Sequence, residues 1–261
     1  MKTYTKKELI GKLKEIKAKG WIKNNRKGNA GSVGNILEDL LGIKENNLPI
    51  PNASEWELKT QRIDTSSLTT LFHTEPSSTA LKFVPSILLP KYGWSHQEAG
   101  KKYSKKEMSF RQTINCLSRS DRGFKVVLDK DQRKVLISFD SQTVDKRHKK
   151  WLEQVKKKAG LGELNPQPYW GFDDLFHKAG TKLLNCFFIQ AQMKKERKTE
   201  YFLYEKILML RKLSLPKFVE AIEKGAILVD FDARTGHNHG TKFRLRQDKL
   251  PELYEEITII S

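Results

Sequence analysis

The chain has 261 residues, of which 38% are hydrophobic, so it is long enough for one large domain or two small ones with a sizeable core. Its 49 Lys and Arg residues outnumber 31 Asp and Glu residues, and the net charge of +18 favours a polyanionic partner, above all a nucleic acid, over a membrane. The sequence shows no run long enough for a transmembrane helix, no secretory signal and no cysteine pattern typical of disulfides or zinc, which indicates a reducing cytoplasm.

The N-terminal region predicts two helices joined by a basic connection. Residues 5–20 place apolar side chains at helical spacing, with lysines on the other face. A glycine-rich connection follows at 21–34, and a second helix is expected from Ser32, as its N-cap, to Gly42. At about 100° per residue, Glu38 falls on the flank of the apolar stripe of this helix, so it borders the core.

The rest of the chain mixes strands and helices without strict βαβ alternation. This mixture predicts an α/β (α+β) fold, with a mixed sheet flanked by helices. Residues 64–100 are expected to be rich in loops. We expect strands at 53–61, near 68–72, at 124–128, 134–139, 184–191, 226–234, 241–246 and 255–261, and helices at 144–158, 170–183 and 215–225.

The strand at 53–61 reads ASEWELKTQ and alternates charged with apolar side chains. Side chains of a strand alternate between its faces. The charged face would carry Glu55, Glu57 and Lys59. Alone, this pattern is typical of a strand with a solvated face. A proline-bounded turn before the strand, a basic loop upstream and Glu38 on the preceding helix favour a catalytic face instead.

This charged face suits the cleavage of a phosphodiester bond. That reaction needs a divalent cation on hard oxygen ligands, and a positive group that positions water or stabilises charge on the phosphate. Glu57 and Lys59 would lie about 7 Å apart on one face and could span a metal-bound phosphate. An acidic residue earlier in the chain, such as Glu38, would supply a further ligand.

Two segments, GNAGSVGNILEDLLG and LPIPNASEWELKT, resemble the core of the MvaI/BcnI-type restriction endonucleases. They are also similar to the MutH-type nicking endonucleases of mismatch repair. The resemblance implies a PD-(D/E)xK restriction-endonuclease-like, MutH-like fold, in which Glu57 and Lys59 match the (D/E)xK pair. Glu38 matches the helix glutamate of that pattern. Asn52 stands where the family has an aspartate, so either Asn52 or Glu55 would complete the metal site.

The resemblance extends to later segments, including HNHGTKFRL near the C-terminus, which is similar to an element that reads the major groove. Arginine can bridge guanine, asparagine can pair with adenine, and aspartate can accept from cytosine. A polar hairpin turn is the alternative. The candidate base-contacting residues are Asp230, Asp232, Arg234, His237, Asn238, His239 and Arg244.

The basic connection before the second helix is a candidate for binding a DNA phosphate. Its side chains Arg26, Lys27 and Asn29 stand beside backbone amides, a combination that suits an anion. A solvated linker is the alternative.

Together these features predict a type II restriction endonuclease. It would use Mg²⁺, or Mn²⁺ in its place, to hydrolyse double-stranded DNA at a short sequence, and the family resemblance implies a target containing CC/GG. The resemblance also implies a monomer without membrane contact, in a bacterial or archaeal cytoplasm, with a cognate DNA methyltransferase. The single unit would have a catalytic lobe at about 1–150 and a recognition lobe at about 165–261. The alternatives are a MutH-like nicking repair enzyme and, because of Asn52, a DNA-binding module with a degraded nuclease site.

Overall fold

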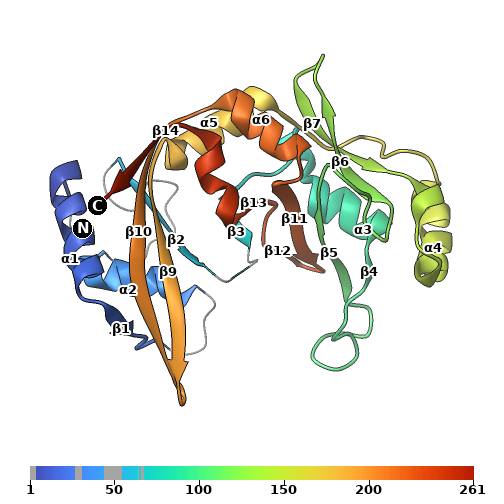
Figure 1. The fold of residues 1–261 in the computed structure, drawn as a ribbon. Coiled ribbons are helices and arrows are strands. Elements are labelled where there is room, and N and C mark those ends of the chain that lie inside the picture. Colours follow the sequence, from blue (N-terminus) through green and yellow to red (C-terminus); the bar gives the residue numbers. More distant parts are fainter. Residues whose placement is uncertain (1–3, 27–30, 44–54, 64, 66–67) are drawn as a thin grey trace. The chain divides into compact units, whose positions relative to one another are not determined.

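The computed structural model describes residues 4–26, 31–43, 55–63, 65 and 68–261 (Figure 1). The chain forms two compact units, each built from stretches that are far apart in the sequence. The sequence expectation divided the chain only once, between about residues 150 and 165. The division differs because strands from the second half of the chain pair with a strand from the first half. Unit 1 consists of Met1–Leu68, His177–Lys217 and Arg246–Ser261, and unit 2 consists of Thr69–Phe176 and Phe218–Leu245.

A mixed sheet forms the centre of unit 1. Its described strands are β1 (Trp21–Lys23), β2 (Glu57–Arg62), β9 (Asn185–Glu196), β10 (Thr199–Leu213) and β14 (Tyr254–Ile260). The order is β1-β10-β9-β2, and β14 also pairs with β10. Strands β9 and β10 form a long antiparallel hairpin. Strand β2 runs parallel to β9, with Glu57 opposite Cys186, so residues from the two halves of the chain lie side by side.

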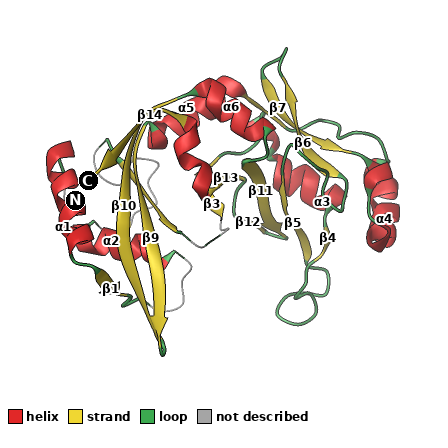
Figure 2. Cartoon of the chain, in the orientation of Figure 1, coloured by secondary structure: helices red, strands yellow, loops and turns green. Residues whose placement is uncertain are grey.

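Two helices pack against this sheet, α1 (Lys6–Ala18) and α2 (Ser32–Leu41) (Figure 2). Apolar side chains of both helices form one buried cluster with β2, β9 and β10. Helix α1 begins with a capping box, in which the Thr5 side chain accepts from the backbone of Glu8 while the Glu8 carboxylate accepts from the backbone of Thr5. The helix therefore begins at the point that the apolar spacing predicts.

A glycine allows helix α2 to lie close to strand β2. A Cβ atom added to Gly34 would stand only 3.0 Å from Thr60 Oγ1 of β2. Glu38 lies one turn after Gly34 and is half-buried, as its predicted position on the flank of the apolar stripe requires. The close packing thus brings this face of the helix to the strand that carries Glu57.

The ends of helix α2 differ slightly from the expectation. The helix stops at Gly42, which adopts a left-handed conformation with φ of 67°, as predicted. The N-cap is Gly31 rather than Ser32. The buried Ser32 side chain accepts a hydrogen bond of 3.3 Å from Asn24 Nδ2. Ser32 therefore ties the start of the helix to the end of β1 instead of capping the helix.

Unit 2 contains two sheets. Its strands are β3 (Leu68–His73), β4 (Trp94–Ser95), β5 (Met108–Ile114), β6 (Phe124–Asp129), β7 (Lys134–Phe139), β8 (Tyr169–Gly171), β11 (Ile227–Arg234), β12 (His237–Asn238) and β13 (Lys242–Arg246). The larger sheet has the order β3-β13-β11-β5-β4, with β12 paired to β11, and the smaller one has the order β6-β7-β8. Phe110, Phe124 and Phe231 pack edge to face in the core of this unit.

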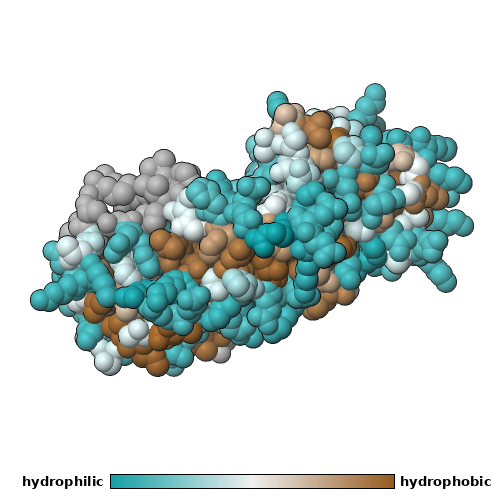
Figure 3. Space-filling model, turned by 90° about the horizontal axis from the view of Figure 1, so that it is seen from above, coloured by the Kyte–Doolittle hydropathy of each residue, from teal (hydrophilic) through white to brown (hydrophobic). Residues whose placement is uncertain are grey.

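The remaining helices complete the fold. They are α3 (Leu89–Tyr92), α4 (Lys149–Ala159), α5 (Phe172–Leu183) and α6 (Leu215–Glu223), with a π-helical turn at Val84–Leu88 and 3₁₀ turns at Thr79–Leu81, Ser141–Thr143, Lys146–His148 and Gln247–Leu253. None of the described helices is long and apolar enough to cross a membrane. Hydrophilic residues cover much of the face drawn in Figure 3, with apolar areas between them.

The mixed α/β prediction is confirmed, and so are the strands expected at 124–128 and 134–139, which pair with each other as β6 and β7. The expectation of loops through 64–100 is wrong in part, because Val84–Tyr92 is helical. Pro85 stands in the first turn of this stretch, where the missing N–H is tolerated, and Pro90 is the second residue after the π-helical turn. Strand β5 was not predicted, although it lies inside the larger sheet of unit 2.

Candidate functional site

The buried carboxylate of Glu57 is the centre of the site in unit 1. Only 1% of Glu57 is exposed, at the first residue of β2. Its Oε1 atom lies 2.8 Å from Lys59 Nζ, so the two charged groups share one face of the strand, as predicted. Leu58, between them, joins the hydrophobic cluster beneath the helices. Because burial strongly disfavours an unpaired charge, this carboxylate depends on the cations around it.

A second ammonium group approaches the same carboxylate oxygen. Lys182, in the last turn of α5, places Nζ 3.6 Å from Glu57 Oε1, and 26% of its side chain is exposed. Sequence analysis missed this residue. The parallel pairing of β2 and β9 explains its position, since the turn just before β9 stands at the end of the sheet where Glu57 begins β2. Two cations thus face one carboxylate, and the excess positive charge suits a further anion.

Two other titratable groups beside Glu57 have the character of core residues. Burial raises the pKa of the Cys186 thiol, and the negative charge of Glu57 raises it further. Burial also raises the pKa of Tyr254, whose hydroxyl donates to the Leu183 carbonyl at 2.7 Å. Both groups are therefore neutral near pH 7. Of these two groups, Glu57 and its two lysines, only Glu57 and the lysines therefore carry charge near pH 7.

The other predicted metal ligands differ in how they are placed relative to strand β2. Glu38 is half-buried on α2, the helix that packs against β2. Glu55 precedes the strand, is exposed, and its Oε1 accepts a hydrogen bond of 3.1 Å from Trp56 Nε1. Asn52 lies outside the described residues. Within the described part of the chain, three or more His, Cys, Asp or Glu side chains do not gather as a preformed metal cage.

A charged face covers the larger sheet of unit 2. On β11, the half-buried Asp230, Asp232 and Arg234 alternate with buried apolar residues. Asp230 accepts from Thr113 Oγ1 at 2.8 Å and pairs with Arg244 at 3.3 Å. These contacts hold the side chains of β5, β11 and β13 as one network.

The remaining ion pairs of this charged face involve the neighbouring residues of β11. Asp232 pairs with Arg111 at 2.7 Å and with Lys242 at 3.2 Å. Burial acts to raise the pKa of Asp232, but the hydrogen bond and charge of Lys242, with the charge of Arg111, outweigh it and lower the pKa. Arg234 pairs with Glu107 at 3.0 Å. Here each carboxylate is matched by at least one cation.

The segment His237–Asn238 forms the short strand β12 beside β11. The rings of His237 and His239 lie 4.2 Å apart. Asn238 donates to Glu75 Oε1 at 3.3 Å and accepts from the Gly240 backbone at 3.0 Å. The segment is thus an ordered polar turn with exposed imidazoles, next to the charged face.

The predicted phosphate-binding connection is only partly described. Arg26 forms a bidentate ion pair with Asp39 of α2, with contacts of 2.6 and 2.9 Å. Lys27 and Asn29 lie outside the described residues. In this structure Arg26 therefore braces the connection against the helix that carries Glu38.

The chain matches the MvaI/BcnI restriction endonuclease family over residues 10–254. It is similar to a solved complex of restriction endonuclease MvaI with its cognate DNA substrate, with 25% identity, a TM-score of 0.74, and coverage of 99% of this chain and 100% of that chain. It is also similar to restriction endonuclease MvaI in the absence of DNA, with 23% identity, a TM-score of 0.57, and coverage of 100% of both chains. A comparison with curated proteins gives no match.

These matches confirm the predicted resemblance and the restriction-endonuclease-like fold. The family match includes the strand with Glu57 and Lys59 as well as the charged face of unit 2. The chain therefore belongs to the MvaI/BcnI restriction endonuclease family and is a type II restriction endonuclease.

Proposed function

We propose that this enzyme hydrolyses phosphodiester bonds of double-stranded DNA at a short specific sequence, with Mg²⁺ as its cofactor. The observation that carries the proposal is the buried Glu57 carboxylate with Lys59 and Lys182 at its Oε1 atom. The related MvaI structure contains a cognate DNA substrate, which supports duplex DNA as the substrate here. The net charge of +18 suits the same partner.

The donor set is compatible with Mg²⁺. This ion is commonly held by one or two carboxylates and completes its shell with water and phosphate oxygens, so it does not need a preformed cage. Glu57 and Glu38 would hold it, with Asn52 or Glu55 as the third donor. When bound, the ion supplies polarisation of the phosphate and a more acidic water.

The lysines supply the positive charge that this reaction requires. Lys59 holds the Glu57 carboxylate in place and would also contact the attacking water or a phosphate oxygen. Lys182 would add a second positive charge on the same side of the carboxylate. Fixed cations at the place where negative charge grows in the transition state lower the barrier.

The charged face and polar turn of unit 2 would read the sequence. Arg244 and the histidines 237 and 239 suit the acceptor edge of guanine, and Asp230 and Asp232 suit the cytosine amino group. This donor and acceptor set agrees with a target containing CC/GG. Arg234 and Asn238 would complete the reading surface, and Arg26, Lys27 and Asn29 would contact the phosphate backbone. The enzyme would act as a cytoplasmic monomer beside a cognate methyltransferase.

Digestion of phage DNA tests the proposal. The purified protein is incubated with the DNA and Mg²⁺, alongside Glu57→Gln, Lys59→Ala and the matched control Glu255→Gln, which changes an exposed carboxylate of β14. We expect discrete double-strand fragments from the unmodified protein and the control, and none from the other two variants. Thermal melting of every variant checks that it is folded. Nicks alone would indicate the repair enzyme, and DNA binding without any cutting would contradict catalysis.

The identity of the third ligand has its own test. Asn52→Asp restores the carboxylate of the family pattern, so activity should stay intact or rise if position 52 contacts the metal. Glu55→Gln should then have little effect. If Glu55 is the ligand, Glu55→Gln should remove activity, whereas Asn52→Asp should change it little. A large loss in Asn52→Asp would show that Asn52 has a different role.

A further inference from the structure

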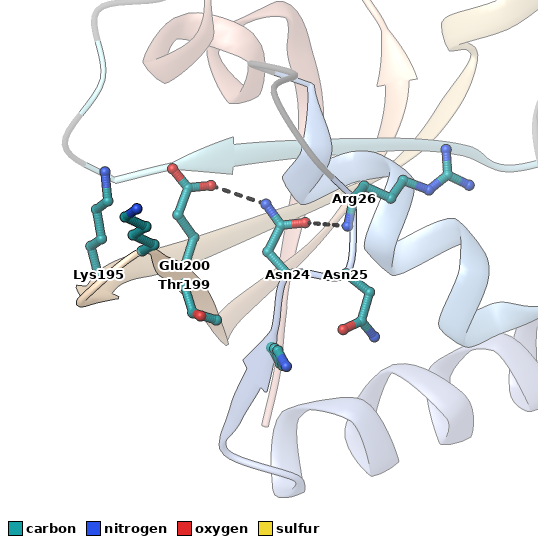
Figure 4. Close-up of a pocket in the computed structure, with 8 residues that line it drawn as sticks. Asn24, Asn25, Arg26, Lys195, Thr199 and Glu200 are labelled. Carbon is teal, nitrogen blue, oxygen red and sulfur yellow. Dashed lines mark hydrogen bonds between the residues drawn. The ribbon is translucent and has the colours of Figure 1, made fainter.

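A cavity of about 440 Å³ lies in unit 1 beside the turn of the β9–β10 hairpin (Figure 4). Its wall combines the end of β1, the connection toward α2 and the hairpin turn. The residues that determine its charge and shape are Lys23, Asn24, Arg26, Lys195, Lys198 and Glu200. Four cations thus face a single carboxylate in this set.

Most of this positive charge is not used inside the protein. Arg26 is engaged with Asp39, and Glu200 accepts from Asn24. The exposed Lys23, Lys195 and Lys198 form no ion pair with the carboxylates that the structure describes. Lys194, in the same hairpin, differs because it pairs with Glu196 at 2.8 Å and lies over the Trp21 ring. The cavity therefore gathers three cations that are available to an external anion.

The cavity is also held in shape by its own hydrogen bonds. The Asn24 backbone donates to the Glu200 carbonyl at 2.8 Å, and its side chain donates to the Glu200 carboxylate at 3.0 Å. The same side chain donates to Ser32 Oγ at 3.3 Å and accepts from the Arg26 backbone at 2.9 Å. Asn24 thereby joins β1, β10 and the start of α2, which fixes the spacing of the cationic walls.

The cavity lies too far from Glu57 to hold the phosphate at which the DNA is cut. Cys186 is opposite Glu57, and Lys195 follows nine residues later on β9. At about 3.3 Å per residue, the two ends of this stretch are roughly 30 Å apart. That length is about nine base pairs of duplex DNA at 3.4 Å per step. A DNA phosphate at this cavity would therefore belong to the flank of the cleaved sequence.

We propose that this cavity binds backbone phosphates of duplex DNA outside the recognition sequence. Lysine ammonium groups and asparagine amides are usual partners of DNA phosphates, and such contacts add affinity without reading bases. The inference rests on the proposed function, and it lengthens the contact between unit 1 and its substrate.

The test measures how DNA binding depends on salt. The variant Lys195→Gln/Lys198→Gln is compared with Lys7→Gln/Lys14→Gln, which removes the same charge from the exposed face of α1. Binding to a labelled duplex of about 30 base pairs, with the cleaved sequence near its centre, is followed without Mg²⁺ from low to high salt. The slope of log K against log salt is negative, and each lost phosphate contact should make it shallower by about 0.9. The hairpin variant, which lacks two lysines, should therefore have a slope that is shallower by about 1.8. The α1 variant should keep the slope of the unmodified protein.

Four further results distinguish the possible explanations. On a duplex of about 10 base pairs, which lacks the flank, the hairpin variant should bind like the unmodified protein. Equal slopes for both variants on the long duplex, with normal cutting by the unmodified protein, would overturn this inference alone. Failure of the unmodified protein to bind or cut DNA would instead overturn the proposed function. If the hairpin variant loses binding of inorganic phosphate but keeps its affinity for the long duplex, a free anion is the ligand and the inference is wrong.

Discussion

The two charged regions of this enzyme use the same residue types in opposite ways. At the start of β2, one fully buried carboxylate faces two lysines, so positive charge is in excess. On the sheet of unit 2, half-buried aspartates and cations pair with one another across β5, β11 and β13. The first arrangement suits a group that must hold added negative charge. The second arrangement holds its donors and acceptors in fixed positions, which suits the proposed reading of base edges.

Changes in the two regions should also have different effects on stability and on specificity. Removing one partner of a buried pair leaves an uncompensated charge and costs about 3–5 kcal/mol, whereas an exposed pair contributes about 0–1 kcal/mol. Changes around Glu57 should therefore affect both folding and catalysis. Changes on the charged face should mainly alter which DNA is cut.

The largest effect should come from removing the lysines beside Glu57. Lys59→Met should reduce the cleavage rate by roughly 100–1000-fold, the usual loss for one group that stabilises the transition state. Lys182→Met should cause a smaller loss, because its Nζ is farther from Oε1. The double variant should unfold at lower denaturant concentration than the two single changes predict together, since it removes both lysines that lie beside the buried Glu57 carboxylate.

Single-turnover cleavage and urea unfolding of the four proteins measure these losses. Lys178→Met, elsewhere on α5, is the control for a lost charge on that helix. If Lys182→Met cuts and unfolds like the unmodified protein, Lys182 has no role beside Glu57. In that case the excess of positive charge at this site has no function.

An intermediate effect is expected on the charged face of unit 2. Arg244→Ala removes a cation that pairs with Asp230 and that can bridge guanine. Cutting at the preferred sequence should weaken by about 1–3 kcal/mol while sequences changed at one position become relatively better substrates. Sequencing of the fragment ends from a randomised library gives the measurement. A uniform loss across all sequences would indicate a phosphate contact instead.

The smallest effect should appear in the pH dependence of stability. Because the pKa of Asp232 is lowered in the folded protein, its carboxylate stabilises the fold above the ordinary carboxyl pKa, near about 3.9. That contribution is lost as the pH falls through the folded-state value. Unfolding of the unmodified protein and of Asp232→Asn should therefore differ at pH 6 and converge as the pH approaches 2. A difference that stays constant over this range would contradict the ion-pair explanation.

Much of the candidate site can be predicted from the sequence, because local periodicity determines which side chains share a face. Alternation along a strand placed Glu57 and Lys59 on one face, and helical spacing placed Glu38 at the border of the core. Lys182 could not be found in this way. It reaches Glu57 only because β9 pairs in parallel with β2, and no local pattern determines which distant strands become neighbours.

The same reason applies to the cavity beside the hairpin turn. Its lysines come from two segments that are far apart in the sequence and are brought together by the pairing of β1 with β10. The helical stretch Val84–Tyr92 lies in a region that the sequence predicts to be rich in loops, and it accommodates Pro85 in its first turn and Pro90 as the second residue after its π-helical turn. In both cases the decisive fact was a position in the folded chain rather than the residue type.

The parallel pairing of β2 with β9 also determines when, during synthesis of the chain, strand β2 can find its partner. Residues 57–62 leave the ribosome early, but their described strand partner is 186–191, and Lys182 comes just before it. A nascent chain that ends before residue 182 still lacks the strand that pairs with β2 and one of the two lysines beside Glu57. The proposed cutting centre can therefore assemble only after β5 and the rest of the first stretch of unit 2, Thr69–Phe176, have been made. A product truncated before residue 182 would carry the (D/E)xK pair without strand β9 and without the second lysine beside Glu57.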